Sequence, residues 1–99
     1  MKLKDRVAIV TGASSGIGRG ICMRFAQEGA RVVVADIQEQ PKQGIYHEQS
    51  TTLPTVEAIR KIGGEAHFVH TDVAAEGAVK ELVDVAVDTY GGIDIIVNN

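Results

Sequence analysis

Four short runs of apolar, mostly β-branched residues constrain the fold of this chain more than any other feature of its sequence. The runs span residues 7–10, 32–35, 66–69 and 93–97. They do not alternate with polar residues, which is typical of strands that are covered on both faces. Helical patterns fill the gaps between them, so the order is β-α-β-α-β-α-β. Because right-handed crossovers join parallel strands, this order predicts an α/β fold with a doubly wound parallel sheet of four strands and three helices.

The three helical patterns differ in clarity. The first has an apolar stripe made of two adjacent rows, Ile17, Ile21 and Phe25 beside Gly18, Cys22 and Ala26. The second spans residues 55–62, starts beside Pro54 and ends at Gly63-Gly64. The third is the clearest and has apolar residues at spacings of three and four, namely Val79, Leu82, Val83, Ala86 and Tyr90. Gly91-Gly92 is expected to end this helix.

Size and charge restrict the class of protein. The 99 residues and the net charge of −3 suit one domain or part of one, with no nucleic acid and no anionic membrane as partner. The first residues contain no long apolar run, so secretion and membrane spanning are not expected. Cys22 is the only cysteine, which favours a reducing compartment. We therefore expect a cytoplasmic protein.

A glycine-rich turn follows the first predicted strand. Residues 11–18 read TGASSGIG and lead directly into the first helix. In a phosphate-binding turn, Gly12 permits a tight exit from the strand, Gly16 lets the backbone approach a pyrophosphate, and Gly18 lets helix and strand pack closely. Ordinary turn glycines are the alternative. The strand before, the helix after and an acid at the next strand end favour dinucleotide binding, and without a Gly-Lys-Ser/Thr sequence a triphosphatase loop is not supported.

The spacing Gly-x-x-x-Gly-x-Gly resembles the signature of the short-chain dehydrogenase/reductase family. Further matches follow in order: Asp36, the pair Asp72-Val73, and Asn98-Asn99, which resembles the start of the family's Asn-Asn-Ala-Gly motif. The resemblance implies that residues 1–99 are the N-terminal part of a Rossmann-type dinucleotide-binding domain, incomplete and truncated after the fourth strand. It also implies hydride transfer between NAD and an alcohol or carbonyl substrate, in a parent protein expected to be a homo-oligomer.

The resemblance assigns cofactor contacts to several positions. The pyrophosphate end is expected to contact Gly12, Ser14, Ser15, Gly16, Ile17 and Gly18. The adenine is expected to contact Asp72 and Val73, and the adjoining ribose edge Asn98. Helix capping is the alternative role for Asp72, since it precedes the third helix. The family's usual Ser or Thr cap after this pair is replaced here by Ala74-Ala75.

Asp36 ends the second predicted strand and indicates which dinucleotide binds. A carboxylate there accepts hydrogen bonds from both adenosine ribose hydroxyls of NAD and repels a 2′-phosphate. NADP-preferring relatives usually supply a basic residue nearby, whereas this chain has Ser14, Ser15 and Ile37. We therefore expect NAD to be preferred over NADP. A solvated loop aspartate is the alternative interpretation.

No catalytic residue is expected within the chain. The family's catalytic tyrosine belongs to a Tyr-x-x-x-Lys pattern, but Tyr46 has Ser50 at that offset and Tyr90 has Asp94. The resemblance places a Ser-Tyr-Lys set, completed by another Asn, beyond Asn99.

No metal site is expected either. His67 and His70 are three apart on a strand and so point to opposite faces, while His47 lies in the aperiodic segment 38–52. Cys22 is interpreted as a small core residue. Segment 38–52 itself is interpreted as a passive surface insertion, with a lid over the ribose as the alternative.

Two other functional classes remain open. One is a non-catalytic NAD- or ADP-binding module, whose fourth strand would be an exposed edge prone to association. The other is a methyltransferase, which also uses a glycine turn and a strand-end acid; the Asp72-Val73 and Asn98-Asn99 matches disfavour it.

Overall fold

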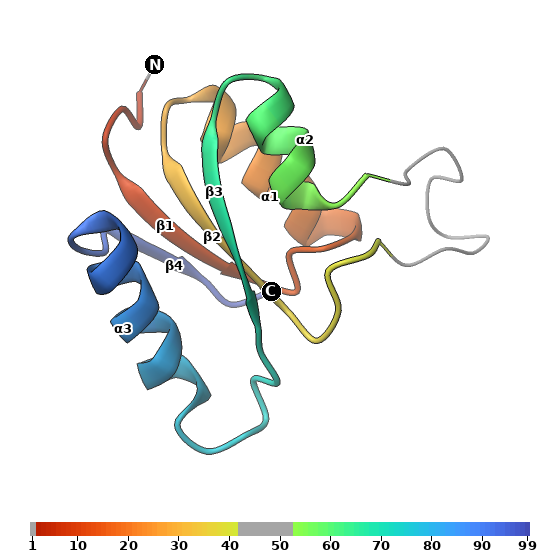
Figure 1. Cartoon of the computed structure of the whole chain (residues 1–99), viewed down its shortest axis with the longest axis vertical. Helices are drawn as coiled ribbons and strands as arrows, with labels where there is room; N and C mark the ends of the chain where they lie inside the picture. The colour runs from red at the N-terminus through yellow and green to blue at the C-terminus, as the bar shows by residue number, and fades with distance from the viewer. Residues whose placement is uncertain (1, 42–52) are drawn as a thin grey trace.

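A parallel sheet organises the part of the chain that the structure describes. In this computed structural model the described residues are 2–41 and 53–99. Within them, the strands are β1 (Val7–Thr11), β2 (Arg31–Asp36), β3 (Glu65–His70) and β4 (Ile95–Val97). All pairings are parallel, in the order β3-β2-β1-β4 (Figure 1). The predicted α/β class, with strands and helices in strict alternation, is confirmed.

Helices cover both faces of this sheet. They are α1 (Gly16–Gln27), α2 (Thr55–Lys61) and α3 (Ala78–Tyr90). Figure 1 shows α1 and α2 together on one face and α3 on the other. The predicted end of α3 is confirmed, because Gly91 follows it in the left-handed conformation with φ of 84°.

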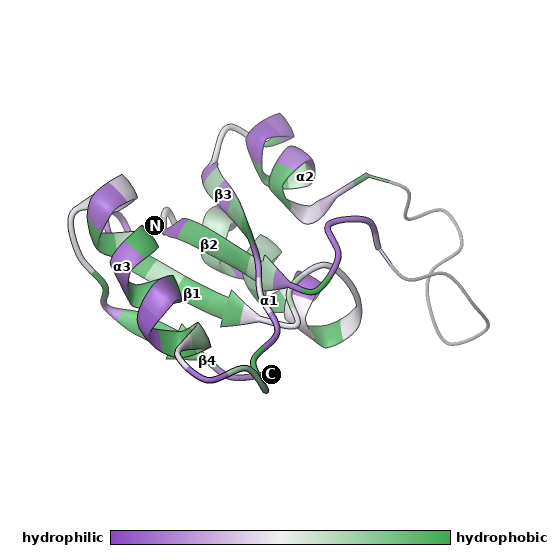
Figure 2. Cartoon of the chain, turned by 60° about the horizontal axis from the view of Figure 1, so that its bottom comes forward, coloured by the Kyte–Doolittle hydropathy of each residue, from purple (hydrophilic) through white to green (hydrophobic). Residues whose placement is uncertain are grey.

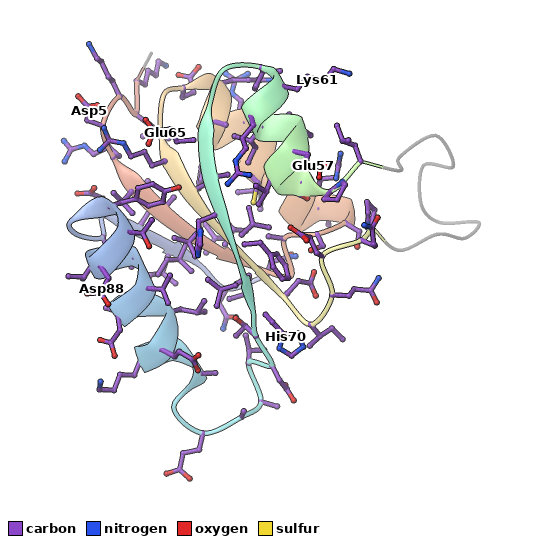
Figure 3. The ribbon with its side chains drawn as sticks, in the orientation of Figure 1. Asp5, Glu57, Lys61, Glu65, His70 and Asp88 are labelled. Carbon is purple, nitrogen blue, oxygen red and sulfur yellow. The ribbon has the colours of Figure 1, made fainter. Side chains whose placement is uncertain are left out.

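The outer surfaces of the helices are polar. Figure 2 shows apolar strands in the middle layer and hydrophilic residues on the outer sides of the helices. Glu57 and Lys61 stand on the outer side of α2 and Asp88 on the outer side of α3 (Figure 3). Among residues 2–41 and 53–99, every helix falls short of the length and apolarity that crossing a bilayer requires.

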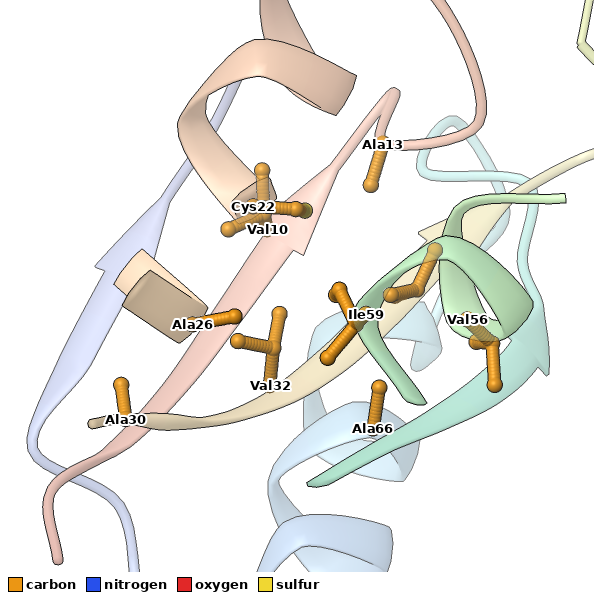
Figure 4. Packing of buried hydrophobic residues seen from close by; sticks show 10 residues of the cluster. Val10, Ala13, Cys22, Ala26, Ala30, Val32, Val56, Ile59 and Ala66 are labelled. Atoms are coloured by element: carbon orange, nitrogen blue, oxygen red, sulfur yellow. The ribbon is translucent and has the colours of Figure 1, made fainter. Parts of the chain in front are cut away.

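Two apolar layers sandwich the sheet, because successive residues of a strand point to opposite faces. On the α1/α2 side, Val10 and Val32 pack with Cys22 and Ile59, and Figure 4 shows this layer from close by. On the α3 side, Ile9 and Val33 pack with Leu82 and Ala86. β1 and β2 are buried on both faces, as their apolar runs predicted, whereas β3 and β4 are only partly buried and the same prediction is wrong for them.

Two details of the sequence prediction are wrong. The fourth strand begins at Ile95 rather than at Ile93. The reason is Asp94, whose carboxylate accepts a hydrogen bond from the Val7 N–H at 2.9 Å and whose own N–H donates to the Val7 carbonyl at 2.9 Å. In addition, Ile17 is 76% exposed. It lies in the first turn of α1, and the buried row of this helix is Gly18, Cys22 and Ala26.

Candidate functional site

The carboxyl ends of all four described strands meet at one edge of the sheet. β1 ends at Thr11, β2 at Asp36, β3 at His70 and β4 at Val97. The glycine turn, Asp36 and Asn99 therefore come together, and Figure 1 shows the C-terminus beside the ends of β1 and β2. This edge of a doubly wound sheet is where ligands bind in such folds.

The glycine turn has the conformation that its sequence predicted. Gly12 and Gly16 both have φ of +60°, which side-chain-bearing residues rarely adopt. A Cβ atom on Gly18 would overlap the Gly12 carbonyl oxygen and lie 2.8 Å from the Gly12 carbonyl carbon. At Gly16, by contrast, a Cβ would meet nothing within 4 Å. Gly18 thus permits close packing of helix and turn, and Gly16 leaves the outer side of the turn open.

The first turn of α1 presents its leading backbone amides at this open side. Ser15 is the N-cap residue, with extended backbone (φ −153°) and without a capping bond from its side chain. The first turn contains no acidic residue. Because the first amides of a helix have no partner within the helix and carry its positive dipole end, they suit an anion.

Asp36 is held against the glycine turn by two backbone amides. Its Oδ2 accepts a hydrogen bond from the Ser14 N–H at 3.0 Å, and its Oδ1 accepts one from the Ile37 N–H at 2.7 Å. The side chain is half-buried. Each carboxylate oxygen keeps a second lone pair, so both remain able to accept a hydrogen bond from a ligand.

The Asp36 carboxylate, rather than the Ser14 hydroxyl, is the group that fits a ligand at this edge. Ser14 is 1% exposed, and its enclosed Oγ has no hydrogen-bond partner among the described residues. Asp36 is half-buried, and each of its oxygens accepts a hydrogen bond from a backbone amide. The residues present therefore fit a hydroxyl-bearing ligand at the Asp36 carboxylate.

Thr11 and Asn99 form a polar connection that the sequence analysis missed. The Thr11 Oγ1 accepts a hydrogen bond from the Asn99 N–H at 3.0 Å and donates to the Asn98 Oδ1 at 3.1 Å. The Asn99 side chain donates from Nδ2 to the Gly12 carbonyl at 3.2 Å. The sequence singled out Asn98 for a cofactor contact; in the structure both asparagine side chains contact segment 11–18, that of Asn98 at Thr11 and that of Asn99 at Gly12. A threonine immediately before the first glycine was the available signal.

Asp72 and Val73 both lie exposed after β3. The Asp72 Oδ1 accepts a hydrogen bond from the Ala74 N–H at 3.0 Å, and the Asp72 carbonyl accepts one from the Ala75 N–H at 2.9 Å. These bonds close a turn upstream of α3, whose N-cap is Gly77. Helix capping as the role of Asp72 is therefore wrong, because the helix starts later than that interpretation requires.

The remaining titratable candidates lie elsewhere. Burial raises the pKa of the Cys22 thiol to about 12, which suits the predicted core residue and not a nucleophile. Tyr90 packs against the α3 layer, and burial raises the pKa of its phenol. Across residues 2–41 and 53–99, no three His, Cys, Asp or Glu side chains gather as metal ligands would. Tyr46 and His47 lie outside the described residues.

A cavity of about 490 Å³ lies at the opposite, amino end of the strands. Its lining includes Arg31, which forms ion pairs with Asp5 at 3.6 Å and Glu65 at 3.3 Å. Figure 3 shows Asp5 and Glu65 at this end and His70 at the other. The cavity shares no residue with the glycine turn.

Known proteins resemble this chain in both sequence and fold. An uncharacterized oxidoreductase of Thermotoga maritima is 42% identical over 97 residues, covering 98% of this chain and 34% of the relative. Tropinone reductase-like 2 of Erythroxylum coca is 40% identical, covering 99% of this chain and 31% of the relative. The crystal structure of hydroxysteroid dehydrogenase from Escherichia coli matches with a TM-score of 0.82 at 36% identity, covering 99% of this chain and 37% of that one.

The family comparison covers nearly all of the sequence. The chain spans about a third of the length of the relatives it matches. The model of the short chain dehydrogenase family matches residues 6–99, which include the glycine turn, Asp36 and Asn98. The chain therefore belongs to the short-chain dehydrogenase family.

Proposed function

We propose that this chain is the NAD-binding part of an oxidoreductase that interconverts an alcohol and a carbonyl by hydride transfer. The Asp36 carboxylate carries the proposal, since Ser14 and Ile37 hold it beside the glycine turn with both oxygens still able to accept hydrogen bonds. The printed names of the relatives, among them a hydroxysteroid dehydrogenase and a tropinone reductase-like protein, support the alcohol and carbonyl class of substrate.

The preference for NAD over NADP rests on the charges around Asp36. A 2′-phosphate would come close to this carboxylate, and like charges at short range repel. Ser14, Ser15 and Ile37 offer no positive charge to offset that repulsion. The nearby Arg19 donates instead to the Leu53 carbonyl at 2.7 Å and to the Thr55 hydroxyl at 3.2 Å.

The bound dinucleotide would supply the hydride chemistry, and the residues of this chain would hold and orient it. In this proposal Asp36 and Ile37 bind the adenosine ribose, while the free amides of α1 and the open side of Gly16 receive the pyrophosphate. Asp72 and Val73 bind the adenine, and Asn98 binds the adjoining ribose edge. We propose that the catalytic Ser-Tyr-Lys set belongs to the rest of a longer parent chain.

Calorimetric titration of the purified chain with NAD, NADP and S-adenosylmethionine tests the proposal. We expect NAD to bind, NADP to bind more weakly, and S-adenosylmethionine not to compete. Asp36→Ala should weaken NAD binding about 10- to 150-fold, because hydrogen bonds to a charged group contribute about 1.5–3 kcal/mol. It should also reduce the preference over NADP.

Asp88→Ala is the matched control, since it removes an exposed aspartate from the outer side of α3. It should leave both affinities unchanged. Retention of the full NAD preference by Asp36→Ala would refute the assignment of this carboxylate. Tighter binding of S-adenosylmethionine than of NAD would favour a methyltransferase instead.

A further inference from the structure

A second polar connection reaches the glycine turn from the start of α2. Thr55, the first residue of α2, is fully buried, and its Oγ1 donates a hydrogen bond to the Ala13 carbonyl at 2.8 Å. The same hydroxyl accepts one from the Arg19 Nη1 at 3.2 Å. Thr55 follows the N-cap residue Pro54, so its hydroxyl is not in the position from which a threonine caps its own helix. Here the hydroxyl bonds instead to a residue 42 positions away in the sequence.

The Ala13-Ser14 peptide joins this hydroxyl to Asp36. The carbonyl of that peptide accepts the bond from Thr55, and its N–H donates to the Asp36 Oδ2 at 3.0 Å. A peptide unit is planar, so the direction of its carbonyl sets the direction of its N–H. A rotation of this unit after loss of the Thr55 bond would therefore move the donor that orients the Asp36 carboxylate.

Among the residues that the structure describes, the other hydrogen bond of Ala13 does not orient the Ala13-Ser14 peptide. The Ala13 N–H donates to the Ala35 carbonyl at 3.1 Å, which fixes the preceding peptide but not the Ala13-Ser14 unit. Ala13 is fully buried, so water is not available to replace the Thr55 hydroxyl as the donor to its carbonyl.

We propose that Thr55 is a positioning residue for cofactor selection: its hydroxyl orients the Ala13-Ser14 peptide and thereby the Asp36 carboxylate. The inference rests on the proposed NAD-binding function and deepens it. Thr55 itself touches no ligand in this scheme and acts through one peptide unit. Its removal should therefore alter the discrimination between NAD and NADP, and not only the stability of the fold.

The test combines binding with a double-mutant cycle in the full chain. Thr55→Val keeps the shape of the side chain and removes the hydroxyl, whereas Thr55→Ser keeps the hydroxyl. We expect Thr55→Val to weaken NAD binding about fivefold, the equivalent of one neutral hydrogen bond, and to lower the preference over NADP. Thr55→Ser should restore both quantities. In an Asp36→Ala background, Thr55→Val should have no further effect on NAD affinity.

Thr71→Val is the matched control. Thr71 is also buried, at 7% exposure, but its hydroxyl bonds to the nearby Val69 carbonyl at 3.1 Å. This variant should leave the ratio of NAD to NADP affinity unchanged. Equal weakening of NAD and NADP by Thr55→Val, or the same weakening with and without Asp36, would show a purely structural role and overturn the proposal.

A second measurement does not depend on binding. Amide hydrogen exchange of the unliganded chain should show faster exchange of the Ser14 N–H in Thr55→Val, with the interior of β1 unchanged. Unaltered Ser14 exchange would overturn the positioning role even if NAD binds, whereas failure of the unsubstituted chain to bind NAD would refute the proposed function alone. If Thr55→Val does not fold, Thr55→Cys provides a milder loss of donor strength for the same comparison.

Discussion

Gly18 and Gly20 lie two residues apart in α1, yet alanine should stabilise the fold at Gly20 and not at Gly18. Replacing an interior helical glycine by alanine normally stabilises a helix by about 1 kcal/mol. At Gly20 a Cβ would meet nothing within 4 Å, so Gly20→Ala should gain this amount. At Gly18 the Cβ would overlap the Gly12 carbonyl oxygen and lie 2.7 Å from the Asn99 Nδ2.

The magnitude for Gly18→Ala follows from what has to move. One obstacle is backbone, so the atom cannot rotate away as a flexible side chain would. Overpacking of this kind costs about 1–3 kcal/mol. Because the gain in helix propensity applies to both variants, it cancels in the comparison. Gly18→Ala should therefore be about 1–3 kcal/mol less stable than Gly20→Ala.

Urea unfolding followed by far-ultraviolet circular dichroism measures this difference without requiring tryptophan, which the chain lacks. The urea midpoint of Gly20→Ala should be higher than that of the unsubstituted chain. The midpoint of Gly18→Ala should be lower than that of Gly20→Ala. Gly18→Ala should also weaken NAD binding, since it displaces the turn at Gly12. Equal midpoints for the two variants would refute the argument that Gly18 is needed for close packing of helix and turn.

Two further predictions concern the core and the connection between the strand ends. Because burial raises the pKa of Cys22 from 9.0 to about 12, its thiol should not react with iodoacetamide at pH 8 until the chain unfolds, and reaction at the unfolded rate would contradict its burial. The unfolded thiol ionises first as the pH rises, so this group should lower the free energy of unfolding between pH 9.0 and about 12 in the unsubstituted chain but not in Cys22→Ala. Thr11→Val should lower the free energy of unfolding by about 1–2 kcal/mol, because the Asn99 N–H and the Asn98 side chain lose their hydrogen-bond partner. Thr11→Ser should recover most of this loss. A urea midpoint of Thr11→Val equal to that of the unsubstituted chain would contradict this role of Thr11.

The sheet could be predicted because its strands have a distinctive local pattern. Residues 7–10 and 32–35 are apolar throughout, and they became the strands that are buried on both faces. The start of β4 could not be predicted in the same way. Asp94 uses its side chain and backbone to bind Val7, and this contact depends on where the chain returns to the sheet.

The candidate site shows the same difference between features that are local in the sequence and contacts between distant segments. Gly12, Gly16 and Asp36 could be proposed from local features of the sequence, and the structure gives the two glycines a positive φ and places Asp36 at the end of β2. The contacts of Thr55 and Asn99 join the turn to residues 42 and 87 positions away in the sequence, so the hydrophobic pattern does not indicate them. Exposure of Ile17 was missed for a related reason, since periodicity does not say where a helix extends beyond the sheet.

These long-range contacts explain how a short chain can prepare Asp36 before a ligand arrives. An isolated aspartate would have to give up rotational freedom on binding, and ordering side chains at an interface reduces affinity. Here the Ser14 and Ile37 amides already restrict the carboxylate, and Thr55 restricts the peptide that carries the Ser14 amide. In the proposed function the cofactor would therefore meet an acceptor that is already oriented, and less rotational freedom would be lost on binding.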